Sequence, residues 1–138
     1  MKKEDFKYED LEKYISNKYV FEDKEYLLLI SEEIFNEDTI RYANGIIKKY
    51  QKEKDFILNY LLEKGLRKFY NNYSDEYIKN NIGKPQISID FAKDDNYPNW
   101  KFEYAGIIEF CESKIDEHIV SIDFVDNLKL DTNVQING

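Results

Sequence analysis

The spacing of apolar residues changes period partway along the chain, and this change constrains the fold more than any other feature. From Ile40 to Phe69, apolar side chains recur every three or four residues, as they do on the buried face of a helix. After Gln86 they alternate with polar side chains, which is typical of half-buried strands. Two short apolar segments precede the helical stretch. The order of strands, helices and then strands predicts an α+β domain.

The helical stretch has a well-marked start and an open question in its middle. Asn36 is a favourable N-cap residue. No glycine or proline lies between Gly45 and Gly65, so a single helix could run to about Tyr70. A helix of about 30 residues would be about 45 Å long, which exceeds the diameter of a domain of this size. We therefore expect either one kinked helix or two helices, with the irregularity near Gln51–Asp55.

Strands are expected on both sides of the helices. Tyr19–Phe21 and Tyr26–Ile30 predict a strand pair around a polar turn, and Phe6–Ile15 is interpreted as a short helix. A second short helix should begin at Ser74 as its N-cap and end near Asn81. The C-terminal meander is expected to include strands at Gln86–Ala92, Trp100–Tyr104 and Ile119–Phe124.

These elements predict a single domain over residues 1–138. We expect a mostly antiparallel sheet, formed by the N-terminal strand pair and the C-terminal meander. It should pack against one long or kinked helix and one short helix. The helix should contact the sheet through Leu58, Leu61 and Leu62.

The chain has one histidine, His118, and one cysteine, Cys111, which removes most routes to catalysis. A zinc site needs three or four ligands, and a catalytic triad needs a base beside its nucleophile. Strand alternation places His118 at an edge of the core, and acidic neighbours of Cys111 disfavour a reactive thiolate. We expect no catalytic residue, no bound metal and no cofactor. The composition thus favours a binding protein over an enzyme.

Charge is unevenly distributed along the sequence. Residues 1–38 carry a net charge of −6, residues 39–85 carry +5 and residues 86–138 carry −7, for a total of −8. An acidic surface disfavours nucleic acid and favours a basic protein partner, although the same charge also keeps a small protein soluble. Asp90, Glu103 and Asp123 lie on the polar side of their expected strands. We take these three acids as the candidate protein-binding residues.

Nothing in the sequence indicates contact with a membrane. The segment Met1–Asp10 has no apolar run behind its lysines, and the longest apolar run, Tyr26–Ile30, is too short to cross a bilayer. One cysteine cannot form an internal disulfide, which fits a reducing compartment. We therefore expect a cytoplasmic protein, whose oligomeric state the sequence leaves open.

Three segments resemble a family of small bacterial domains, some of which are encoded beside polymorphic toxins and resemble their immunity proteins. They are LEKGLRKFYNNY at Leu62–Tyr73, DDNYPNWKFEY at Asp94–Tyr104 and DEHIVSIDF at Asp116–Phe124. Where such domains tend to have glycine after the Glu-His pair, this chain has Ile119. The resemblance implies a protein that neutralises a toxin by stoichiometric binding, without catalytic residues. A regulatory or assembly protein with another partner is the alternative, and a small enzyme is less favoured.

Overall fold

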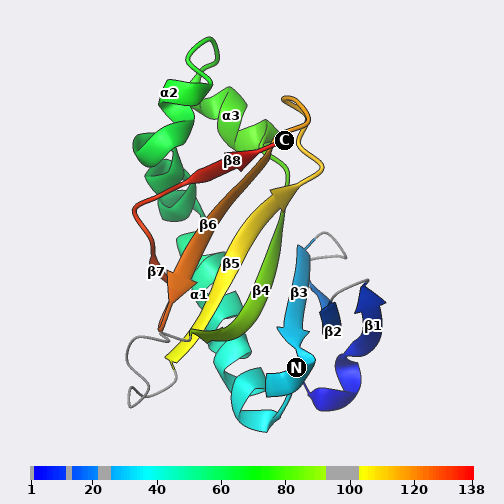
Figure 1. Ribbon diagram of the computed structural model, residues 1–138. Helices are drawn as coiled ribbons and strands as arrows, with labels where there is room; N and C mark the ends of the chain where they lie inside the picture. Colours follow the sequence, from blue (N-terminus) through cyan, green and yellow to red (C-terminus); the bar gives the residue numbers. More distant parts are fainter. Residues whose placement is uncertain (1, 12–13, 22–25, 93–102) are drawn as a thin grey trace.

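The computed structural model of the chain is an α+β fold in which one sheet carries its helices on a single face (Figure 1). It describes residues 2–11, 14–21, 26–92 and 103–138. The strands in this part of the chain are β1 (Lys7–Leu11), β2 (Tyr14–Phe21), β3 (Tyr26–Ser31), β4 (Lys84–Ala92), β5 (Glu103–Cys111), β6 (Ile119–Val125), β7 (Lys129–Leu130) and β8 (Gln135–Asn137). The α-helices there are α1 (Glu37–Leu61), α2 (Arg67–Phe69) and α3 (Asp75–Asn81).

The strands lie in the order β1-β2-β3-β4-β5-β6-β7, and β8 also pairs with β6. All neighbouring pairs described are antiparallel except β3 and β4, which run parallel. The parallel pair arises because the whole helical region connects the end of β3 to the start of β4, as a crossover must. The mostly antiparallel sheet expected from the sequence is confirmed, whereas the parallel pair at its centre was not anticipated.

One nearly continuous helical rod crosses the sheet. The α1 helix passes through a π-helical turn at Leu62–Leu66 into α2. Asn36 caps its start, because the side-chain oxygen accepts a hydrogen bond of 2.9 Å from the backbone N–H of Thr39. Glu53 departs from helical geometry with φ −108° and ψ 18°. The cap and the kink expected within Gln51–Asp55 are both confirmed.

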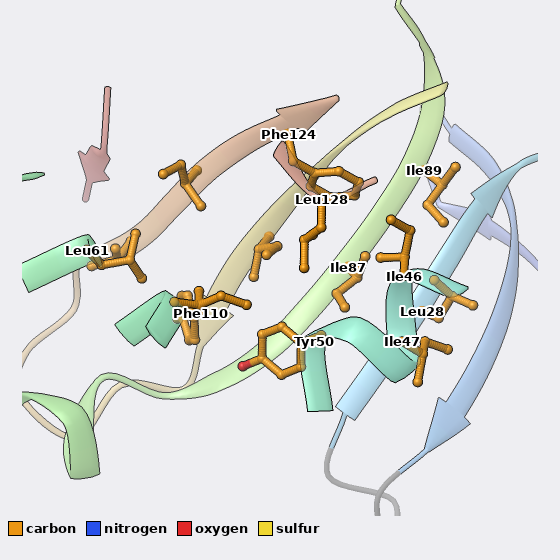
Figure 2. Packing of buried hydrophobic residues seen from close by; sticks show 14 of the residues in the cluster. Leu28, Ile46, Ile47, Tyr50, Leu61, Ile87, Ile89, Phe110, Phe124 and Leu128 are labelled. Carbon is orange, nitrogen blue, oxygen red and sulfur yellow. The ribbon is translucent and has the colours of Figure 1, made fainter. Parts of the chain in front are cut away.

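The core lies between this rod and one face of the sheet. Figure 2 shows Ile46, Ile47 and Tyr50 of α1 turned toward strand residues such as Leu28 and Ile87. The helical leucines predicted to contact the sheet are in place: Leu61 and Leu62 are buried, and Leu58 is partly buried against the same cluster. Burying each such side chain contributes about 1.5–3 kcal/mol to folding.

Polar side chains at the margin of α1 bind the turn after β6. Tyr42 and Lys49 donate hydrogen bonds to the backbone carbonyls of Asp126 and Asn127. The Tyr42 ring also stacks on Tyr104, with centroids 4.4 Å apart. Burial, together with the nearby Asp126 and Tyr104, raises the pKa of Tyr42 to about 12. These contacts hold the exposed margin of the helix to the sheet.

The N-terminal segment contradicts one prediction. Phe6–Ile15 is not a helix, because Lys7–Leu11 forms β1 and β2 has already begun at Tyr14. Pairing of β1 with β2 satisfies the backbone across strands, and the Phe6 ring packs between Tyr19 and Phe35 at 5.6 and 5.0 Å. Tertiary contacts here override the weak helical spacing.

The C-terminal strands are longer and more numerous than expected. Of the predicted strand Trp100–Tyr104, residues 103 and 104 begin β5, and residues 100–102 lie outside the described part of the chain. The β5 strand then continues to Cys111. The β8 strand was not predicted, because three residues are too few to show an alternating pattern.

Candidate functional site

The described helices lie on one face of the sheet and leave the opposite face uncovered (Figure 1). On β4, the buried Ile87 and Ile89 alternate with Gln86, Ser88 and Asp90, which are half-buried or exposed. Strand register carries this alternation to the neighbouring strands. We call this surface the open face. Its central described residues are Val20, Leu27, Leu29, Gln86, Ser88, Asp90, Ala105, Ile107, Glu109, Asp123 and Val125.

The structure brings two of the three predicted binding acids onto this face. Asp90 is paired with Ala105 of β5, and Asp123 is paired with Ile107 one step further along β5. Asp90 and Asp123 are therefore separated by two strand spacings across the sheet and by two residues along the strands. Their Cα atoms are roughly 12 Å apart. Asp90 is exposed and Asp123 is half-buried. Glu103 begins β5 opposite Ala92, and its side chain lies outside what the structure describes.

Glu109 is a third acid on the open face, and it was missed as a binding residue. It is paired with Gln86 on one side and with Ser121 on the other. The sequence indicates this position, because Glu109 stands between the apolar residues Ile108 and Phe110. Both of these neighbours are buried in the structure.

Aliphatic side chains separate these acids. Ile107 is 38% exposed and Val20 is 40% exposed, while Leu29 and Val125 are half-buried. A surface in which exposed aliphatic groups adjoin carboxylates resembles a protein interface, where an apolar centre excludes water and charges set the partner. The open face therefore combines exposed aliphatic groups with carboxylates.

Lysines lie at the margins of the open face, among them Lys84 and Lys129. Lys84 is at the start of β4, and its ammonium group lies 3.4 Å from the carboxylate of Glu112. Lys129 is on the short β7 and is paired with Val125. The three acids thus lie within β4, β5 and β6, whereas Lys84 lies at the start of β4 beside Glu112 and Lys129 lies on the next strand.

His118 lies at the edge of the core, as the alternation predicts. Its Nδ1 atom is 3.0 Å from Asp116 Oδ2, and its ring meets Phe69 edge-on at 5.2 Å. Tyr70 donates a hydrogen bond of 2.9 Å to the other Asp116 oxygen. Burial opposes ionisation of Asp116, but the hydrogen bonds from His118 and Tyr70 outweigh it and hold its pKa below the usual value.

Cys111 has the character expected of an unreactive thiol. It is half-buried at the end of β5. Burial first, and then the carboxylates of Glu109 and Glu112, raise its pKa above the ordinary value. A protonated thiol is a poor nucleophile and a poor metal ligand.

In the described ranges, no group of three or more His, Cys, Asp or Glu side chains is arranged so that it could hold a metal ion. That the protein binds no metal and no cofactor stays a prediction, and elemental analysis of protein purified without added metal tests it. No helix in the described part of the chain is both long and apolar enough to cross a membrane.

A cleft of about 450 Å³ lies between α1, α3 and the adjoining ends of β4 and β5. Its charged groups largely neutralise one another. Lys79 binds Asp55 at 3.1 Å, and Lys84 lies beside Glu112 at 3.4 Å. The cleft therefore presents little net charge to a ligand.

No protein-family model matches the chain, and comparisons with curated proteins and with solved structures found no similar protein.

Proposed function

We propose that this chain is a non-enzymatic binding protein that docks a basic protein on the open face of its sheet. The observation that carries the proposal is the one-sided fold, in which Asp90, Glu109 and Asp123 stand among exposed aliphatic side chains on an uncovered face. Binding would be stoichiometric. The aliphatic groups would supply buried apolar area, and the carboxylates would select a positively charged partner.

The resemblance to immunity proteins makes a toxin with a basic active site, such as a nuclease, the first partner to test. An acidic inhibitor would cover such a site much as nucleic acid does, because both present negative charge to it. A regulatory or assembly protein with a different basic partner is the alternative. The single cysteine supports a cytoplasmic location for either.

Affinity capture from a lysate of the source cells tests the proposal when three forms of the protein are compared. Ile107→Lys places a charge at the centre of the open face. Phe56→Lys makes a similar change on α1, where Phe56 is 66% exposed. We expect the wild type and Phe56→Lys to retain the same basic protein and Ile107→Lys to lose it. Retention by all three forms, or capture of an acidic partner, would contradict the proposal.

A further inference from the structure

A second surface feature lies on the helical side of the molecule. Five rings form a connected cluster where α2, α3 and the segment before β6 meet. We call them the aromatic patch: Phe69, Tyr70, Tyr73, Tyr77 and His118. Phe69 is 48% exposed, Tyr73 is 45% exposed and Tyr77 is 39% exposed. Large aromatic groups are rarely left exposed side by side without a partner.

Contacts between neighbouring rings order the aromatic patch before any partner binds. Tyr73 and Tyr77 stack with centroids 4.7 Å apart and planes 15° from parallel. Phe69 meets Tyr70 edge-on at 4.8 Å. Tyr70 itself is only 5% exposed and is anchored by its hydrogen bond to Asp116. The side chains of the patch would therefore lose little entropy when a partner docks on them. Such preorganisation is typical of interface hot spots.

Carboxylates adjoin these rings. Asp116 binds the Tyr70 hydroxyl, and Glu117 lies close enough to contribute to the raised pKa of Tyr70, after burial and Asp116. The nearby Arg67 is already engaged, because its guanidinium binds both oxygens of Asp75 at 3.2 and 3.0 Å. Negative charge beside exposed ring faces attracts a cation, and a guanidinium satisfies both features because it stacks on rings and pairs with carboxylates.

We propose that the aromatic patch is a docking site for an arginine side chain of a protein partner, separate from the open face. The guanidinium would lie over an exposed ring face of the Tyr73–Tyr77 pair, and the carboxylate of Glu117, near Tyr70, would add long-range attraction. His118 shares the helical side of the sheet with Val120, whereas Asp90 and Asp123 lie on the opposite side. The two surfaces can therefore be tested independently.

The test uses a short Gly/Ser peptide with two arginines, titrated into the full chain and followed by NMR of the aromatic rings. The same peptide with citrulline in place of arginine removes the charge and keeps the shape. We expect the arginine peptide to shift the resonances of Tyr73 and Tyr77 and the citrulline peptide to leave them nearly unchanged. Tyr77→Leu should weaken the arginine titration about twofold to fivefold, as the loss of one exposed cation–π contact implies.

Phe56→Leu is the matched control, because it removes an exposed aromatic ring that lies outside the patch on α1. It should leave the titration unchanged, and Glu117→Gln should weaken it. Equal shifts with the citrulline peptide would overturn the proposal, as would equal weakening by Phe56→Leu. Shifts with a neutral oligosaccharide but none with the arginine peptide would also overturn it, since they would assign the patch to carbohydrate.

Discussion

Individual polar side chains tie the helical layer to the sheet. Asp116 shows this best, because one carboxylate accepts hydrogen bonds from the Tyr70 hydroxyl and from the backbone N–H of His118 while pairing with the His118 ring. These contacts join α2 and the connection before β6. They also couple the stability of this end of the molecule to pH.

Asp116→Asn should lower the free energy of unfolding at pH 7 by about 1.5–3 kcal/mol, the order of one hydrogen bond to a charged group. The pKa of Asp116 is lower in the folded chain than in the unfolded chain. Its contribution is therefore complete above the unfolded value of about 4 and is lost as the pH falls toward the folded value. Urea unfolding at pH 7 and at pH 3 measures this. A difference between variant and wild type that persists undiminished at pH 3 would refute it.

Asn36→Ala should destabilise the protein by about 1 kcal/mol, because it removes the acceptor for the Thr39 N–H at the start of α1. Asn72→Ala, in the exposed turn before α3, is the matched control and should change stability by less than about 0.5 kcal/mol. Denaturant unfolding of both variants gives the comparison. Equal effects would mean that the cap contributes nothing beyond the loss of an amide.

At the level of helices and strands, some features could be predicted from the sequence and others could not. The cap at Asn36, the irregularity at Glu53 and the strand Gln86–Ala92 were predictable because local spacing and local chemistry determine them. The parallel pairing of β3 with β4 was not, because it depends on where a long crossover returns the chain. The segment Phe6–Ile15, which was wrongly assigned as a helix, is too short for its apolar spacing to distinguish a helix from a strand.

The candidate site was predictable only in part for the same reason. Alternation within a strand placed Asp90 and Asp123 on polar sides, but only the sheet register shows that these sides form one surface. The aromatic patch gave no signal, because its rings come together through the α2–α3 connection and the segment before β6. Phe69 continues the helical apolar spacing and yet is 48% exposed.

Two glycines, Gly45 in α1 and Gly106 in β5, differ in the space available for a side chain. At Gly106 in β5, an added Cβ would clash with Ser88 O and with the Phe124 ring, whereas at Gly45 in α1 it would meet nothing within 4 Å. Gly45→Ala should stabilise the protein by about 0.5–1 kcal/mol through its helix propensity. Gly106→Ala should destabilise it by about 1–3 kcal/mol through overpacking. Thermal and urea unfolding test both, and a stabilising Gly106→Ala would show that the close approach of β4, β5 and β6 is wrong.

At the scale of the whole molecule, the fold has two layers, one of helices and one sheet (Figure 1). Helices cover one face of the sheet, and the other face exposes Val20 on β2 and, beside Asp123, Ile107 on β5. The net charge of −8 gives the protein a long-range field, which accelerates encounter with a basic partner and is screened by salt. The proposed basic partner would bind the open face.

Association kinetics with the captured partner test this claim most directly. The double variant Asp90→Lys/Asp123→Lys should slow association about tenfold at low salt, within the range that electrostatic steering covers. Glu37→Lys/Glu63→Lys makes the same change in net charge on the helical side and should slow it by less than about threefold, since only the long-range field is altered. Raising salt should slow the wild type most. If both double variants slow association equally, or if neither variant nor salt changes the rate, the open face is not the docking surface.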